Sequence, residues 1–72
     1  MPYFYVNRNA QANGDHEVHE DTTPQCSNAP LSSNRDPLGF HVNCRSAVAE
    51  ATSRGYRRAN GCYYCARACH TT

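Results

Sequence analysis

The alternation of apolar and polar side chains predicts three strands. Residues 3–6 are aromatic or β-branched, and residues 16–20 alternate around a central valine. Asn13-Gly14 between these two segments is typical of a tight turn, so we expect the two strands to pair antiparallel. In residues 38–42, three apolar side chains alternate with glycine and histidine, and this pattern predicts the third strand.

The register of the first two strands depends on the length of their connection. A strict two-residue turn at Asn13-Gly14 places Val18 on the face of Tyr3 and Tyr5. A longer loop or a bulge places Val18 on the other face, with Phe4 and Val6. The sequence leaves both registers open.

A helical repeat follows the third predicted strand. Four small or apolar residues have the i, i+3, i+4, i+7 spacing of one helix face, and Asn43 before them is a good N-cap. With Gly55 as the C-terminal stop, the pattern predicts a helix over residues 44–54. Its apolar face is made of Cys44, Ala47, Val48 and Ala51. Because these side chains are small, we expect the helix to lie close to the sheet.

The remaining segments are predicted to be loops and a short tail. Residues 21–37 hold three of the four prolines and predict a long loop, and Asn60-Gly61 predicts another turn. The tail over residues 62–70 has the spacing of a second short helix. The expected fold is therefore α+β: one small domain over residues 1–72, with a three-stranded antiparallel sheet packed by one helix and a cysteine-rich C-terminal short helix.

The composition indicates that the core needs an additional crosslink. The chain has 72 residues, 39% hydrophobic content and a mean hydropathy of −0.81, with no tryptophan and two phenylalanines. In a domain this small, burial at about 25 cal/mol per Å² of apolar surface roughly cancels the loss of chain entropy. Five cysteines are the natural source of the missing stabilisation. Because five is odd, a framework that pairs every thiol within the chain is disfavoured.

The strongest chemical signal is a C-x2-C-x3-C-H run over residues 62–70. Two cysteines separated by two residues at a turn present two thiolates to one tetrahedral Zn²⁺. A structural zinc site needs four ligands, and a ligand in the loop over residues 21–37 would fasten that loop to the C-terminus. The predicted site is therefore a structural zinc held by Cys26, Cys62, Cys65 and Cys69.

Other assignments of these residues stay open. Cys44, His19 and His70 are alternative ligands, and in the favoured set Cys44 is the cysteine left over. The same cysteines can instead form disulfides or pack as small apolar side chains. A thiol redox protein that uses the Cys62–Cys65 pair is a further alternative, although the chain lacks the βαβ pattern in which such pairs normally lie.

Charge is distributed unevenly along a chain whose net charge is +1. Residues 1–43 carry two arginines and five acidic side chains, whereas residues 44–72 carry five arginines and one glutamate. We interpret this asymmetry as attraction between the two halves of the fold. The alternative is a zinc-dependent nucleic-acid binder that uses Arg54, Arg57, Arg58 and Arg67 together with nearby tyrosines.

Several functional classes find no support in the sequence. It has no run of 18 apolar residues for a membrane span, and the N-terminus has no secretory leader, so we expect a cytoplasmic protein in which clustered cysteines bind metal. The His16-Glu17-Val18-His19 segment has the wrong spacing for a zinc protease. Since no enzyme site is recognised, we expect an interaction or regulatory module, with a protein as its possible partner.

Two resemblances to known proteins arise at these motifs. Residues 55–58 (Gly-Tyr-Arg-Arg) followed by Cys62-x-x-Cys65 resemble the end of the Ada-type zinc domain of DNA methyl-phosphotriester repair proteins. This resemblance implies a small sheet with helices and a zinc site of four thiolates. Arg58 stands where that family has proline, and the family's methyl-acceptor cysteine has no match, so the repair activity is not carried over.

The second resemblance covers more of the chain. The N-G-D-H-E-V-H segment over residues 13–19 and the G-C-Y-Y-C-x3-C-H-T segment over residues 61–71 are similar to those of a group of short uncharacterised bacterial proteins. This resemblance implies a bacterial protein and brings no activity with it.

Overall fold

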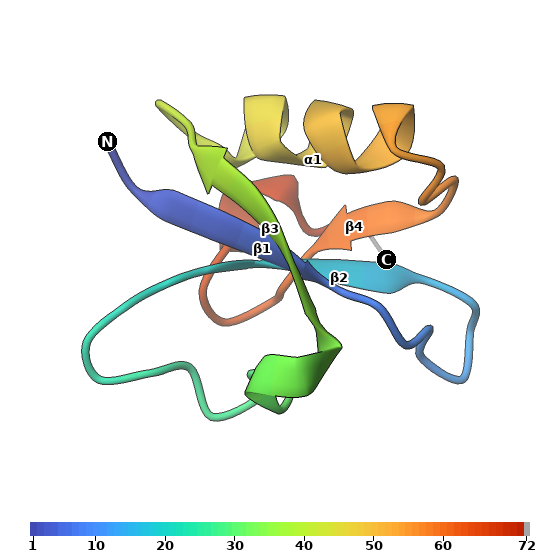
Figure 1. Ribbon diagram of the computed structural model, residues 1–72, viewed down its shortest axis with the longest axis horizontal. Coiled ribbons are helices and arrows are strands. Elements are labelled where there is room, and N and C mark those ends of the chain that lie inside the picture. The colour runs from blue at the N-terminus through green and yellow to red at the C-terminus, as the bar shows by residue number, and fades with distance from the viewer. Residues whose placement is uncertain (72) are drawn as a thin grey trace.

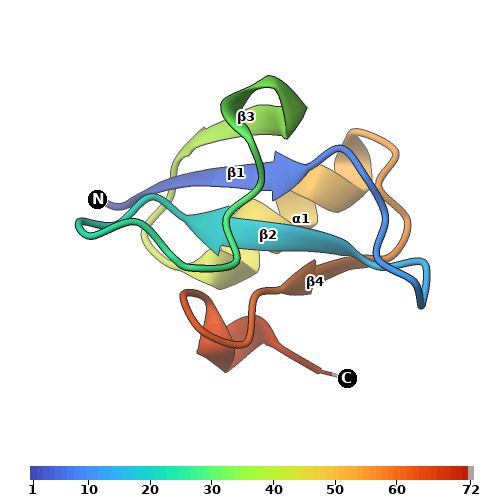
Figure 2. The same ribbon diagram turned by 90° about the horizontal axis from the view of Figure 1, so that it is seen from below.

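One mixed sheet of four strands organises the computed structural model, which describes residues 1–71. The strands are β1 (Tyr3–Asn7), β2 (His16–Glu20), β3 (Arg35–Phe40) and β4 (Ala59–Gly61). Their order is β3-β1-β2-β4 (Figure 2); β1 pairs antiparallel with β2 and β3, whereas β2 and β4 are parallel. The helical elements are α1 (Cys44–Ser53) and two 3-10 turns, η1 (Ser32–Asn34) and η2 (Arg67–Cys69). Among residues 1–71, no helix is long and apolar enough to cross a membrane.

The predicted α+β class, the helix and the first two strands are confirmed, and a third strand is present but spans Arg35–Phe40 rather than residues 38–42, so it begins inside the predicted loop. The sheet is not the predicted three-stranded antiparallel one. The fourth strand, β4, contains Asn60-Gly61, which we expected to form a turn. This segment is extended because it pairs with β2, and the pairing continues beyond it through a 2.9 Å hydrogen bond from the Cys62 N–H to the Val18 carbonyl. The predicted second helix over residues 62–70 is reduced to the single turn of η2.

The first hairpin adopts the register of the longer connection. Val6 pairs with Val18, and the Gln11 N–H donates to the Asp15 carbonyl at 2.8 Å within the turn. Phe4, Val6 and Val18 therefore share one face of the sheet. Their side chains are at most 1% exposed.

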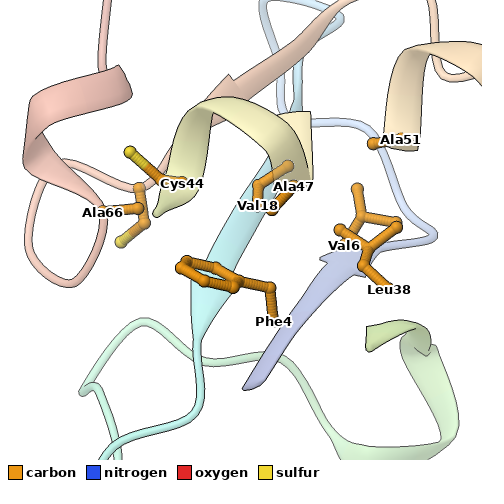
Figure 3. Packing of buried hydrophobic residues seen from close by; sticks show 9 residues of the cluster. Phe4, Val6, Val18, Leu38, Cys44, Ala47, Ala51 and Ala66 are labelled. Atoms are coloured by element: carbon orange, nitrogen blue, oxygen red, sulfur yellow. The ribbon is translucent and has the colours of Figure 1, made fainter. Parts of the chain in front are cut away.

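Helix α1 covers this face (Figure 1) and completes the core. Asn43 caps the helix with its side-chain oxygen, which accepts from the Arg45 N–H at 3.0 Å, and Gly55 follows the helix with a φ of +103°. The small side chains of the predicted helical face allow a close approach to the sheet (Figure 3). The buried cluster is made of Phe4, Val6, Val18, Leu38, Cys44, Ala47, Ala51, Cys62 and Ala66.

The connection between β2 and β3 covers the opposite face of the sheet (Figure 1). On this side, the Arg35 guanidinium lies 4.7 Å from the centroid of the Tyr5 ring, and its Nε donates to the Pro30 carbonyl at 2.9 Å. The sheet thus has a helix on one side and a long loop on the other. The loop brings Cys26 toward β2.

A disulfide joins the two helical elements of the C-terminal half. Cys44, the first residue of α1, is bonded to Cys69 of η2, with a Cα–Cα distance of 6.2 Å and a sequence separation of 25 residues. The other three cysteines, Cys26, Cys62 and Cys65, carry free thiols.

Candidate metal centre

The three free cysteines lie in one cluster with a histidine. The Sγ atoms of Cys26, Cys62 and Cys65 and one ring nitrogen of His19 all lie within 4.8 Å of one another. The Cys26 and Cys62 sulfurs are 3.8 Å apart, and the Cys65 sulfur is 3.4 Å from Nδ1 of His19. Three segments of the chain contribute to the cluster: β2, the β2–β3 loop and the turn directly after β4.

These distances fit a tetrahedral zinc site. With Zn–S bonds of about 2.3 Å and a Zn–N bond of about 2.0 Å, adjacent ligand atoms of a tetrahedron are about 3.5–3.8 Å apart. The sulfur–sulfur distance of 3.8 Å and the sulfur–nitrogen distance of 3.4 Å agree with two edges of such a tetrahedron. The cluster can therefore hold a metal ion with little rearrangement.

The parallel pairing of β2 and β4 places Cys62 next to His19. The register pairs Val18 with Gly61, and the hydrogen bond from the Cys62 N–H to the Val18 carbonyl extends it by one residue. One position beyond the pair Val18–Gly61, each strand leads to a residue of the cluster: His19 in β2 and Cys62 directly after β4. One ladder of backbone hydrogen bonds thus positions two of the four side chains.

A tight turn after β4 positions Cys65. The Ala66 N–H donates to the Cys62 carbonyl at 3.0 Å, which closes the turn, and the Tyr64 N–H donates to the Cys62 sulfur at 3.4 Å. Backbone donors of this kind favour the thiolate over the thiol. The Cys-x-x-Cys segment therefore forms a tight turn that presents the Cys62 and Cys65 sulfurs to the cluster, as its spacing predicted.

His19 is held as a neutral imidazole. Its ring is fully buried and stacks on Tyr5, with centroids 5.4 Å apart. Burial, with a smaller contribution from the positive charge of Arg35, lowers the pKa of His19 to about 4. A neutral ring has a lone pair to offer a metal, and here Nδ1 is the nitrogen near Cys65.

The other nitrogen of His19 faces a carboxylate. Its Nε2 lies 3.4 Å from Oε1 of Glu17, whose side chain is 12% exposed. Burial raises the pKa of Glu17. The contact does not have hydrogen-bond geometry, but a negative charge at this distance favours the tautomer with the proton on Nε2, which leaves Nδ1 free to coordinate.

Burial also raises the pKa of the Cys62 and Cys65 thiols. Without a cation nearby, these thiols stay protonated at neutral pH and are weak nucleophiles. A bound divalent cation reverses this preference because it binds the thiolate form directly. The electrostatics of the cluster therefore suit metal ligation better than thiol turnover.

The structure brings together three of the four predicted ligands. Cys26, Cys62 and Cys65 are in the cluster, whereas Cys69 is bonded to Cys44 and lies outside it. The fourth member is His19, which the sequence offered only as an alternative. The strand pattern of residues 16–20 shows which face His19 occupies, but nothing local shows that β4 lies alongside.

The remaining candidate residues have other contacts. His70 Nδ1 bonds to the Gly61 carbonyl at 3.1 Å. Among the arginines, Arg54 pairs with Glu50 at 2.8 Å and Asp36 at 3.3 Å, and Arg58 pairs with Asp15 at 3.0 Å. Arg67 lies over the ring of Tyr63. Much of the positive charge proposed for a nucleic-acid surface is thus neutralised within the fold.

Comparison of this chain with protein-family models, with curated proteins and with solved structures found no match.

Proposed function

We propose that this protein is a small zinc-binding interaction or regulatory module whose structural Zn²⁺ is held by His19, Cys26, Cys62 and Cys65. The observation that carries this proposal is the convergence of the four ligand atoms within 4.8 Å. The donor set supports zinc, since thiolate and imidazole ligands in tetrahedral arrangement are typical of structural zinc sites.

A structural role follows from the number and burial of the ligands. Catalytic zinc sites keep one coordination position open for water or substrate, whereas four protein ligands close the shell. His19 and Cys62 are fully buried, whereas Cys26 and Cys65 are partly exposed. The cluster therefore suits stabilisation rather than catalysis.

The metal would connect three parts of the fold that lie far apart in the sequence. Cys26 lies in the long loop between β2 and β3, Cys65 lies in the C-terminal turn, and His19 lies in a central strand. One ion thus crosslinks the loop and the tail to the sheet. In a domain with a thin core, metal-binding free energy becomes folding free energy.

Two other functions receive less support from the structure. Redox turnover by Cys62 and Cys65 is disfavoured because burial raises the pKa of both thiols. Nucleic-acid binding is disfavoured because Arg54 and Arg58 already pair with carboxylates of the same chain.

The test is a metal titration of the disulfide-intact, metal-free protein. We expect one Zn²⁺ per chain by elemental analysis and a tetrahedral Co²⁺ absorption spectrum that includes thiolate-to-metal bands. His19→Ala should reduce zinc affinity by a factor of ten or more, because it removes one ligand of four. The matched control is His41→Ala, since His41 bonds to Ser46 and the Leu38 carbonyl away from the cluster.

Two results would overturn the proposal. A zinc content near zero under saturating metal would exclude the site altogether. Equal zinc affinity in the His19→Ala variant and the parent protein would exclude His19 as a ligand.

A further inference from the structure

The Cys44–Cys69 disulfide crosslinks the C-terminal segment, which carries two of the proposed ligands, to the start of α1. Cys62 and Cys65 stand seven and four residues before Cys69. Two hydrogen bonds also hold the segment to β4: His70 Nδ1 bonds to the Gly61 carbonyl at 3.1 Å, and the Thr71 N–H donates to Oδ1 of Asn60 at 3.0 Å. The disulfide adds a covalent link to the packing of Ala66 in the same buried cluster as Cys44 and Ala47 of α1.

Close packing couples the disulfide to the ligand-bearing turn. A Cβ atom added to Gly61 would lie 2.5 Å from the Ala66 carbonyl oxygen and 2.7 Å from Cβ of Cys69. Ala66, which follows Cys65, and Cys69 of the disulfide therefore both pack closely against Gly61 of β4. If Cys69 moves away from Gly61, we expect Ala66 to move with it, because the Cys69 N–H donates to the Ala66 carbonyl at 3.0 Å. Ala66 directly follows Cys65, a proposed ligand.

A cavity of about 280 Å³ opens beside the disulfide, between the start of α1 and the turn after β4. Cys44 of the disulfide and Cys65 of the Cys/His cluster both line it, so one opening gives access to both features. Two opposite charges, Glu20 and Arg67, also lie on its wall, and Phe4 is among its apolar residues. The volume lies just below the range of about 300–1,000 Å³ that is typical of pockets for drug-sized ligands, so it suits a smaller molecule.

We propose that the Cys44–Cys69 disulfide is a redox control on the metal centre, reduced through this cavity by a small thiol that carries both an ammonium and a carboxylate group. Arg67 attracts the carboxylate, and Glu20 attracts the ammonium. The inference rests on the proposed zinc site and adds its regulation.

Reduction proceeds by two thiol–disulfide exchanges. The thiolate of the first small thiol attacks the Cys44 sulfur; a new S–S bond forms, the Cys44–Cys69 bond breaks, and Cys69 leaves as a thiolate that takes a proton from water. A second small thiolate attacks the sulfur of the small molecule in this mixed disulfide and releases Cys44 as a thiolate, which is protonated in turn. Two small thiols are oxidised to one disulfide, and one protein disulfide is reduced to two thiols.

Reduction weakens metal binding because it removes preorganisation. In the oxidised protein, the disulfide holds the Cys62–Cys65 turn in place before the metal arrives. In the reduced protein, metal binding must also order this segment. The entropy that is lost in this ordering lowers the zinc affinity of the reduced protein. We expect zinc to bind about ten-fold more weakly, the effect of ordering one or two additional side chains.

The first experiment compares zinc affinity in the two redox states. Competition titrations are run on the oxidised protein, on the protein reduced with a phosphine, and on the Cys44→Ala/Cys69→Ser variant, which lacks both the disulfide and the additional thiols. Weaker binding by the last two supports the proposal. Equal affinity in all three overturns it, and so does tighter binding by the reduced protein, which would indicate that Cys69 becomes a ligand. If the variant does not fold, the comparison of oxidised and reduced parent protein decides alone.

The second experiment tests the route of reduction. The rate of disulfide reduction is measured on the metal-free protein with cysteine and with the neutral thiol 2-mercaptoethanol. Arg67→Ala should lower the rate of reduction by cysteine several-fold relative to the rate with 2-mercaptoethanol. The control Arg57→Ala should leave the ratio of the two rates unchanged. An unchanged ratio in Arg67→Ala overturns the cavity as the route.

Failure of this proposal is distinguishable from failure of the zinc site. If the oxidised protein binds no zinc, the proposed function fails. If it binds zinc with the same affinity after reduction, only the redox control fails.

Discussion

At the scale of single residues, the two nitrogens of His19 have different partners and therefore different roles. Nδ1 lies near the Cys65 sulfur, and Nε2 lies near the carboxylate of Glu17. Stacking on Tyr5 fixes the plane of the ring between them. The position of one proton on this ring thus decides whether the cluster has four ligands or three.

Glu17 is expected to act on the metal through His19. Glu17→Gln removes the negative charge beside Nε2 and should weaken zinc binding about ten-fold, at the lower end of the range for loss of such a partner. A competition titration measures the effect, with Glu50→Gln on the exposed side of α1 as the control. Unchanged zinc affinity in Glu17→Gln would contradict this role. If the affinity falls and the Co²⁺ spectrum still shows four ligands, His19 remains bound and the effect of Glu17 is on its strength as a ligand.

The metal-free protein should lose stability as pH falls because His19 is buried in its neutral form. The pKa of His19 in the folded protein is about 4, below the value of 6.5 for an unperturbed histidine. The unfolded chain therefore binds this proton first, so the contribution of His19 is complete above pH 6.5 and is lost between pH 6.5 and 4. The free energy of unfolding should fall by no more than about 1.4 kcal/mol per pH unit from this group.

Urea unfolding at several pH values measures this dependence. His19→Phe retains an aromatic ring against Tyr5 and removes the titrating group, so its stability should depend less on pH than that of the parent. Parallel curves for the two proteins would contradict the assignment.

Gly61 is required by close packing rather than by its backbone angle. Gly61→Ala places a methyl group against the Ala66 carbonyl and Cys69, and should cost about 2–3 kcal/mol of stability, in the range of overpacked sites. It should also weaken zinc binding, since Ala66 follows a ligand. Gly39→Ala is the control, because its Cβ meets no atom within 4 Å and its cost comes from a φ of +84°. Zinc affinity that falls equally in both variants would contradict a local effect at Gly61.

At the scale of elements, the long β2–β3 loop reaches the cluster through one side chain, that of Cys26. Local contacts such as the hydrogen bond from the Ala29 N–H to the Cys26 carbonyl, at 3.0 Å, shape the loop, but Cys26 is its link to the cluster. Arg35 adds a contact to Tyr5 at the end of the loop. The metal is therefore expected to decide how rigid this element is.

Cys26→Ser should release the loop in the presence of zinc. Amide hydrogen exchange over residues 22–34 should become faster in the variant than in the zinc-bound parent, whereas exchange in β1 and α1 should change less, because their core contacts remain. Ser27→Ala, one residue along the chain, is the control. Equal protection of the loop in Cys26→Ser and the parent would show that the loop is held without the metal.

At the scale of the whole molecule, the small core is supplemented by a disulfide and, in the proposed function, by a metal ion. The buried cluster contains one phenylalanine, two valines and one leucine among smaller side chains. The disulfide joins α1 to η2, and the metal would join the loop, β2 and the C-terminal turn. Each crosslink connects segments that the other does not.

Zinc should therefore stabilise the oxidised protein by mass action. At a free zinc concentration 100 times the dissociation constant, the free energy of unfolding should rise by about 2.7 kcal/mol, less any contribution from metal binding to the unfolded chain. Thermal or urea unfolding with buffered zinc measures this increase, and a chelator should reverse it. The His41→Ala variant should show the same increase. A stability that does not change with zinc would contradict a structural role for the metal.

The sequence alone predicted the parts of this fold that depend on local patterns. The strand over residues 3–6, the helix after Asn43 and the tight turn from Cys62 to Cys65 follow from side-chain alternation, capping and spacing, which act over a few residues. The expectation of a crosslink follows from composition, because a short chain with few large apolar side chains has little surface to bury. Cys26 was placed in the site because a loop of that length needs an anchor.

Only the tertiary structure decided the fourth member of the cluster. A three-residue strand such as β4 is too short for a periodic signal, and Asn60-Gly61 reads locally as a turn. Its parallel pairing with β2 brings Cys62 beside His19, while the packing of η2 on α1 brings Cys69 to Cys44. Both events join residues more than 20 positions apart, and the free energy of such contacts depends on how the whole chain closes on its core. For this reason, the sequence predicted the three cysteines of the cluster but not its histidine.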